Sequence, residues 1–125
     1  MNKLLIIDDD PLIRNYLKVL FEEMYEVIIA EDGEQGELYA DQYKPRLIIS
    51  DIQMPKITGM QFVLNLRRQK PPVLTPVVLF SGSIDQKVMD FVQTQKFVYA
   101  LEKLTPPSEI QETILTIEDE TEAKE

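Results

Sequence analysis

The chain contains no cysteine and no histidine among its 125 residues. Without cysteine there is no disulfide bond, no thiolate nucleophile and no zinc site built on sulfur. Without histidine there is no Ser-His-Asp arrangement, no imidazole ligand for a transition metal and no imidazole general base. Any chemistry must therefore depend on carboxylates, hydroxyls and lysine, and carboxylates favour hard cations such as Mg²⁺.

Excess positive charge and long apolar runs are also missing. The formal charge is −9 at pH 7, so the chain lacks the basic composition that nucleic-acid binding requires. The apolar runs reach about six residues at most, which is too short to cross a bilayer or to act as a signal peptide. We therefore expect a cytoplasmic protein with no direct nucleic-acid contact and no membrane insertion.

Short apolar runs alternate with segments of helical spacing along the chain. The runs are continuous rather than alternating, which is typical of strands covered on both faces; they lie at 4–7, 27–30, 47–49, 77–80 and 97–101. One helix is predicted to begin at Asp10-Pro11, a capping carboxylate followed by proline in the first turn. The other predicted helices lie near 33–43, 58–69, 84–95 and 107–118.

Five successive β-then-α units predict an α/β fold, a doubly wound five-stranded parallel sheet with helices on both faces. The length suits one domain, which we place at residues 1–118. Residues 119–125 are predicted to be an acidic tail, either a solvated helix end or the start of a linker.

Chemically active side chains recur where the predicted strands end. Ligands of a doubly wound sheet bind beyond the carboxyl ends of its strands. Each of these residues alone is commonly a cap, a turn residue or a solvated charge, but together they indicate a site. They are Asp8, Asp9 and Asp10 after the first strand, Asp51 after the third, Ser81 after the fourth and Lys103 after the fifth.

Three carboxylates brought together at this edge would repel one another. A divalent cation resolves that repulsion, and Mg²⁺, with Mn²⁺ as a possible substitute, accepts carboxylate, carbonyl and phosphate oxygens. The predicted ligands are Asp8, Asp9, Asp51 and the backbone carbonyl of Gln53. Lys103 and the Ser81 hydroxyl could then contact a phosphoryl group transferred to a carboxylate.

The segments Leu5–Pro11 and Ile49–Pro55, with Gly59, resemble the receiver domain of two-component response regulators. The motif Asp-x-x-Met-Pro-x-x-x-Gly is matched in full, and the resemblance runs from about Lys3 to Ile117. It implies a flavodoxin-like fold similar to that of chemotaxis regulators, with strand order 2-1-3-4-5.

The resemblance also implies a role for each site residue. It makes Asp51 the phosphoacceptor, Asp9 a direct Mg²⁺ ligand and Asp8 a ligand largely through water. It makes Ser81 the switch hydroxyl and Lys103 the lysine that pairs with phosphate. The donor would be a phosphohistidine on a sensor histidine kinase or a histidine phosphotransfer protein, which agrees with the lack of histidine here.

Two positions after the fifth predicted strand depart from the family pattern. Ala100 stands where an aromatic switch residue is usual, and strand alternation should send the neighbouring Tyr99 to the opposite face. Leu104 replaces the proline that normally follows the lysine after a cis bond. Because a cis bond before a non-proline residue costs about 2.5–4 kcal/mol, we expect the Lys103-Leu104 bond to be trans.

Two other functions remain open from the sequence. The altered positions favour a receiver-like docking module that signals without phosphorylation. The run Asp8-Asp9-Asp10 superficially fits a small phosphatase of the haloacid dehalogenase type, although Leu12 and the absence of a later acid pair oppose that interpretation. Self-phosphorylation and self-dephosphorylation at Asp51 are expected, but no turnover of an external substrate. Output is expected through a downstream effector protein or domain, and a dimer through the last two helices and the fifth strand is possible.

Overall fold

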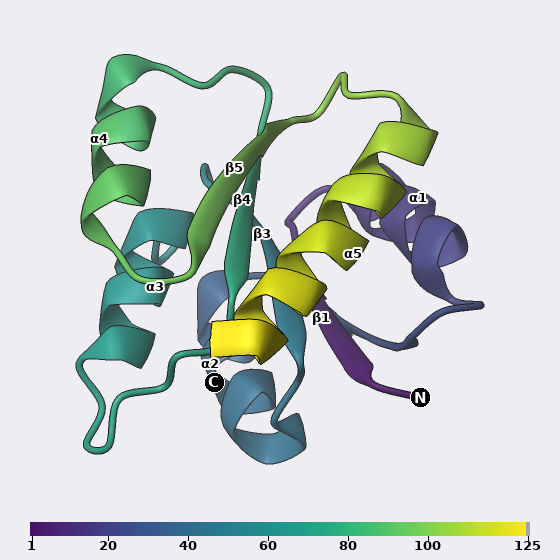
Figure 1. Ribbon diagram of the computed structural model, residues 1–125. Coiled ribbons are helices and arrows are strands. Elements are labelled where there is room, and N and C mark those ends of the chain that lie inside the picture. Colours follow the sequence, from purple (N-terminus) through teal and green to yellow (C-terminus); the bar gives the residue numbers. More distant parts are fainter. Residues whose placement is uncertain (125) are drawn as a thin grey trace.

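The computed structural model describes residues 1–124, and the side chains of 1–122. Five strands alternate with five helices (Figure 1). The strands are β1 (Lys3–Ile7), β2 (Glu26–Ala30), β3 (Leu47–Asp51), β4 (Val77–Ser81) and β5 (Val98–Glu102). The helices are α1 (Pro11–Phe21), α2 (Gly33–Tyr43), α3 (Gly59–Arg67), α4 (Gln86–Thr94) and α5 (Pro107–Lys124).

The strands form one parallel sheet in the order β2-β1-β3-β4-β5, which confirms the predicted fold class and strand order. The register pairs Ile7 of β1 with Ser50 of β3, and Asp51 with Phe80 of β4. The order places β1 and β3 side by side at the centre. The residues that follow them therefore emerge next to each other at the carboxyl edge of the sheet.

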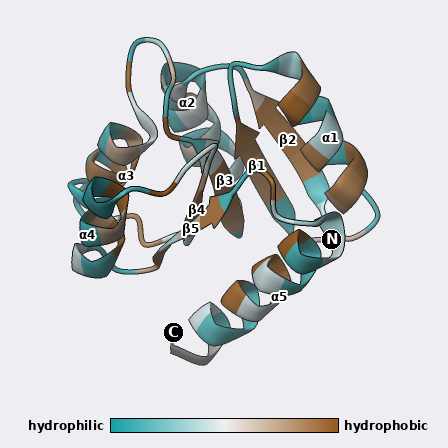
Figure 2. Ribbon diagram, turned by 90° about the horizontal axis from the view of Figure 1, so that it is seen from above, coloured by the Kyte–Doolittle hydropathy of each residue, from teal (hydrophilic) through white to brown (hydrophobic). Residues whose placement is uncertain are grey.

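Helices cover both faces of the sheet, with α1 and α5 on one side and α2, α3 and α4 on the other (Figure 2). Alternate residues of each strand serve the two faces. In β1, Leu4 and Ile6 pack toward α1 and α5, whereas Leu5 and Ile7 pack toward the other three helices. This double burial explains why the apolar runs are continuous.

Local signals in the sequence account for the helix starts. Asp10 caps α1, accepting a hydrogen bond from the Leu12 amide, and Pro11 occupies the first turn as predicted. Gly36 interrupts α2 with a poor helix former, but the helix forms. A Cβ at position 36 would lie 2.5 Å from Ile7 Cδ1, so glycine allows α2 to approach β1 closely.

Helix α5 continues beyond the predicted boundary at residue 118 and ends at Lys124. Thr121 is buried, and its hydroxyl donates to the Ile117 carbonyl. The helix is therefore still packed against the domain at position 121, although the neighbouring Glu120 is exposed to solvent. The domain boundary stays a prediction, and it falls within a continuous helix.

Residue 125 lies outside the described part of the chain. Between residues 1 and 124, no helix is both long and apolar enough to span a membrane.

Candidate functional site

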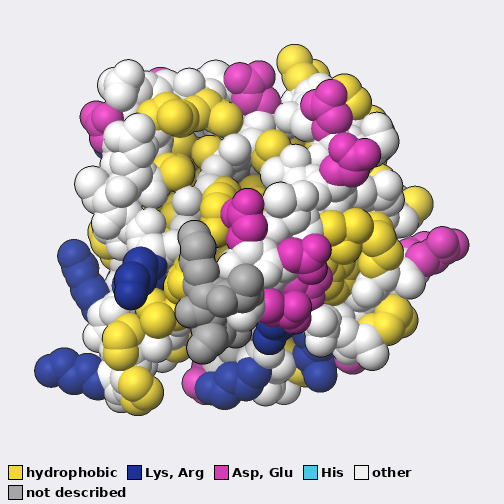
Figure 3. All heavy atoms as spheres, in the orientation of Figure 1, with side chains coloured by type: hydrophobic (Ala, Val, Ile, Leu, Met, Phe, Trp, Pro, Cys, Tyr) yellow, Lys and Arg dark blue, Asp and Glu magenta, His cyan; other side chains and the backbone are white. Residues whose placement is uncertain are grey.

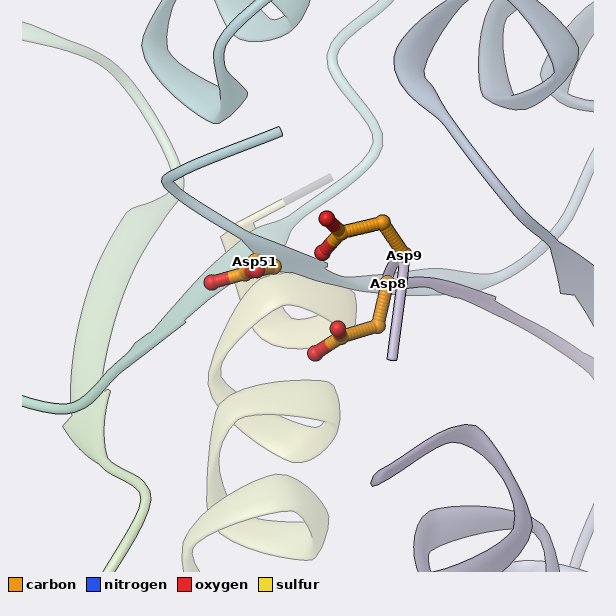
Figure 4. Close-up of side chains that lie close together, drawn as sticks. All are labelled: Asp8, Asp9 and Asp51. Carbon is orange, nitrogen blue, oxygen red and sulfur yellow. The ribbon is translucent and has the colours of Figure 1, made fainter. Parts of the chain in front are cut away.

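Asp8 and Asp9 follow β1, and Asp51 is the last residue of β3. Figure 4 shows the three side chains extending from neighbouring strand ends into one small region. Each offers a carboxylate oxygen, and these oxygens all lie within 4.8 Å of one another. The predicted convergence of acids at the carboxyl edge is therefore present in the structure.

Two of these carboxylates are buried. Asp8 is 1% exposed and Asp51 is 7% exposed, whereas Asp9 faces solvent. Asp8 Oδ1 accepts a hydrogen bond from the Asp10 amide at 2.9 Å, and Asp51 Oδ1 accepts one from the Ile52 amide at 2.9 Å. Asp8 Oδ2 is buried without a hydrogen-bond partner. A buried oxygen in that state is costly, which indicates that the site is built for a ligand.

Lys103 brings a single positive charge to this cluster from the end of β5. Its Nζ lies 3.1 Å from Asp51 Oδ1 and 3.4 Å from Asp8 Oδ2. The Lys103 amide also donates to the Ser81 carbonyl at 2.7 Å, which fixes the start of the loop after β5. One lysine thus serves two buried carboxylates, and the described cluster keeps an excess of negative charge.

Burial and repulsion shift the protonation equilibria of the cluster. Burial is the main cause that raises the pKa of Asp51, and the nearby Lys103 opposes it. Burial likewise raises the pKa of Asp8, opposed by the Asp10 amide and reinforced by the charge of Asp51. Burial acts to lower the pKa of Lys103, but its contacts with Asp51 and Asp8 outweigh burial and raise it. The site therefore favours any added positive charge.

Ser81 is the last residue of β4, and Gln53 follows the end of β3. The Ser81 hydroxyl donates to the Ser83 carbonyl at 2.8 Å, so it is engaged within its own loop. Gln53 is exposed, two residues beyond Asp51 in the β3–α3 loop. Helix α3 begins against the end of β3, because a Cβ at Gly59 would lie 2.4 Å from the Asp51 carbonyl oxygen. This close approach explains the glycine at the end of the third-strand motif.

The two departures near β5 take the predicted arrangement. Tyr99 packs toward α1 and α5, and Ala100 packs toward α2, α3 and α4, so the tyrosine ring does not replace an aromatic residue at position 100. Among the described residues the cis peptide bond is Lys70-Pro71, and the Lys103-Leu104 bond is therefore trans. The Leu104 side chain is 87% exposed.

One contact at the site was missed by the sequence analysis. Arg14 of α1 donates from Nη1 to the backbone carbonyl of Asp8 at 2.8 Å. It holds the turn that presents Asp8 and Asp9. The sequence carries a signal for this contact, since Arg14 lies one helical turn after the cap Asp10.

The donor set suits a hard divalent cation. Three carboxylates offer oxygens within reach of one another, and one buried oxygen lacks a hydrogen bond. Oxygen-only ligands and the absence of nitrogen or sulfur donors are typical of Mg²⁺ rather than of zinc or copper. The residues present therefore fit such an ion.

The fold and the acidic site together define a doubly wound α/β domain of the chemotaxis-regulator type. The family model of the response regulator receiver domain matches residues 4–115, and this chain belongs to that family. Receiver domains are the phosphoacceptor modules of two-component signalling; they interact with histidine kinases and effector domains, and they generally bind Mg²⁺ through acidic residues.

Solved structures and curated proteins agree with this assignment. The chemotaxis protein CheY4 of Vibrio cholerae superposes with a TM-score of 0.85 at 27% identity, over 94% of this chain and 98% of that one. The transcriptional regulator RpaA of Synechocystis is 32% identical over 120 residues, 94% of this chain and 48% of that protein. The regulator PhoP of Bacillus subtilis is 33% identical over 85 residues, 67% of this chain and 35% of that protein. This chain thus spans about half or less of these two curated relatives.

Proposed function

We propose that this chain accepts a phosphoryl group on the carboxylate of Asp51 from a phosphohistidine of a sensor histidine kinase or a histidine phosphotransfer protein. The observation that carries the proposal is the contact of 3.1 Å between Lys103 Nζ and Asp51 Oδ1, beside two further carboxylates. A buried nucleophile thus has a cation beside it and two neighbouring carboxylates that could hold a second one.

In the proposed step an Asp51 oxygen attacks phosphorus, a P–O bond forms, and the P–N bond to the donor imidazole breaks with its electron pair returning to nitrogen. Lys103 neutralises charge on a transferred phosphoryl oxygen from its place beside Asp51. Asp8, Asp9, Asp51 and the Gln53 carbonyl would hold Mg²⁺, or Mn²⁺, which when bound offsets the negative charge of carboxylates and phosphoryl group.

The Ser81 hydroxyl must turn to take part. It donates to Ser83 in the structure, and contact with a phosphoryl oxygen requires it to give up that bond. A charged phosphoryl oxygen is a stronger hydrogen-bond acceptor than the Ser83 carbonyl, so the exchange favours rotation of the Ser81 hydroxyl. The population shift that follows phosphorylation thus begins in the loop after β4.

Output through protein contacts is proposed at the face formed by α4, β5 and α5. An open groove of about 510 Å³ lies there, lined by apolar side chains that include Met89, Val92 and Tyr99 and by the acids Glu112 and Glu120. This groove supports binding of an effector or of a second copy. Cytoplasmic placement stays a prediction.

The test is incubation of the protein with Mg²⁺ and acetyl phosphate followed by intact-mass measurement. We expect an adduct of about 80 Da, the mass of one phosphoryl group, that is absent from Asp51→Asn and from samples with excess chelator. Absence of an adduct under varied conditions would instead favour the phosphorylation-independent docking module, which Ala100 supports. The receiver-family match leaves the phosphatase interpretation without support.

A further inference from the structure

The β3–α3 loop, residues 52–58, is held at several points along its length. Ile52 and Met54 are 3% and 9% exposed, and both pack into the core beneath α3. The exposed Gln53 lies between these two buried residues. The direction of the Gln53 carbonyl therefore depends on how the rest of the loop is anchored.

The outer part of this loop is attached to the start of α2. Lys56 Nζ lies 3.3 Å from Asp32 Oδ2 and 3.7 Å from a carboxylate oxygen of Glu34. The next residue, Ile57, packs on Gly33, where a Cβ would lie 2.2 Å from Ile57 Cγ1. Two successive loop residues, one through charge and one through packing, thus contact the same helix start.

Asp32 is itself fixed in position. Its Oδ1 accepts the Gln35 amide at 2.8 Å as the cap of α2, which leaves Oδ2 to Lys56. That amide is the main cause that lowers the pKa of Asp32, and Lys56 lowers it further. The carboxylate that receives the lysine is therefore anchored to a helix rather than free to follow the loop.

Lys56 has a backbone conformation that a non-glycine residue rarely adopts, with φ of 72°. Such conformations cost free energy and persist where surrounding contacts impose them, often at functional sites. A lysine at this point also opposes cation binding by simple charge repulsion. Lys56 belongs to the loop that joins Asp51 to α3, and its contact with Asp32 can hold that loop in place.

We propose that the Lys56–Asp32 ion pair is a positioning device for a divalent-cation site, which holds the β3–α3 loop so that the Gln53 carbonyl is presented beside Asp51. The inference rests on the proposed function for the identity of the site. It assigns to Lys56 and Asp32 no contact with the cation. Their effect is on the geometry of a neighbouring ligand.

The direction in which one substitution changes the Mg²⁺ affinity distinguishes a positioning role from a simple charge effect. Lys56→Ala removes a positive charge near the site, so electrostatics alone predicts tighter Mg²⁺ binding, whereas loss of positioning predicts weaker binding. We expect weaker binding by about two- to fivefold, the range for an exposed ion pair, in an NMR titration of the unphosphorylated protein. The amides of residues 52–57 should show altered shifts before Mg²⁺ is added. Unchanged or tighter binding by Lys56→Ala would overturn the proposal.

Lys44 provides a matched control. It also has a positive φ, 48°, and pairs with an acid, Asp41, at 3.3 Å, but it lies between α2 and β3 at the amino edge of the sheet. Lys44→Ala loses the same charge, the same kind of ion pair and the same side-chain bulk. We expect its Mg²⁺ affinity to equal that of the wild type. A loss equal to that of Lys56→Ala would show that losing any surface lysine ion pair weakens binding, and would defeat the proposal.

Two further variants separate the ion pair from the backbone conformation. Lys56→Arg keeps the charge and should retain most of the affinity. Lys56→Gly relieves the left-handed conformation without restoring the pair, so it should remain weaker than the wild type; full recovery in Lys56→Gly would show that the pair is not needed. Failure of the proposed function looks different, because the wild type itself would then give no adduct with acetyl phosphate.

Discussion

At the carboxyl edge of the sheet, one lysine serves two of three clustered carboxylates, whereas at the amino edge one carboxylate, Glu118, is matched by several donors. Glu118 of α5 accepts hydrogen bonds from Tyr25 at 2.5 Å and from Asn2 at 2.9 Å. Arg46 lies 3.9 Å from the same carboxylate and also pairs with Glu122. Figure 3 shows Lys and Arg side chains gathered toward the lower side of the molecule, where the strands begin.

The difference shows how charge serves two purposes in one fold. At the amino edge, acids and bases meet, and the contacts attach the end of α5 to the strands. At the carboxyl edge, Asp8 Oδ2 is left buried without a hydrogen bond. Lys103 Nζ lies 3.4 Å from that oxygen but is shared with Asp51, so the buried charge is compensated only in part. Such incomplete compensation is costly to stability, and the carboxyl edge is therefore where the molecule is prepared for a ligand rather than for folding.

The largest effect is expected for Lys103→Met, which removes the cation of the carboxyl edge. Loss of a group that stabilises developing charge typically slows a reaction by about 10²–10³-fold. We expect the rate of adduct formation with acetyl phosphate to fall by that factor, measured by intact mass over time. Lys96→Met, which removes an exposed lysine before β5, should react like the wild type. Equal rates of adduct formation for the two variants would show that Lys103 has no role in the reaction.

Tyr25→Phe probes the amino edge alone. It deletes a hydrogen bond to a charged acceptor, a class worth about 1.5–3 kcal/mol. We expect the free energy of unfolding in urea to fall by that amount while the rate of phosphorylation is unchanged. Tyr43→Phe, at a half-exposed ring on α2, should leave the unfolding curve in place. A parallel loss of phosphorylation would contradict the separation of the two edges.

Removal of residues 119–125 tests whether the end of α5 belongs to the domain. The truncated chain loses the buried Thr121 and the contact between Glu122 and Arg46. We expect a loss of about 1–2 kcal/mol in stability with phosphorylation intact. A truncated chain as stable as the full one would support the boundary predicted at residue 118.

The strands and the convergence of the acids were predictable because they follow from local patterns. The apolar run around Leu47 identifies a buried strand, and parallel strands must present their ends at one edge, which brings Asp8, Asp51 and Lys103 together. The predicted helix 33–43 coincides with α2 despite Gly36.

Contacts between distant residues were not predictable in this way. Tyr25 and Glu118 are 93 positions apart, and nothing in the composition of the acidic tail distinguishes a docked helix from a solvated one. The direction of the Ser81 hydroxyl depends on the conformation of the Ser83 loop, and the lysine contact of Asp32 depends on the backbone at Lys56. Such features arise from tertiary packing and carry no periodic signal.

The smallest expected effect is a gain of stability in Asp51→Asn. Removing the Asp51 charge relieves its repulsion with the neighbouring carboxylates, but the gain is small because Lys103 also loses one of its two carboxylate partners. Burial raises the pKa of Asp51, so the folded protein holds this proton more tightly than the unfolded chain does. That contribution is complete below the pKa of the unfolded chain, about 4, and is lost as pH rises through the folded pKa. Without Mg²⁺, Asp51→Asn should therefore melt above the wild type at neutral pH. The difference should shrink as pH falls toward about 4, as followed by circular dichroism. Asp41→Asn, at an exposed acid on α2, should show no such gain. A lower melting temperature for Asp51→Asn than for the wild type at neutral pH would contradict the view that the carboxyl edge is arranged for ligand binding at a cost in stability.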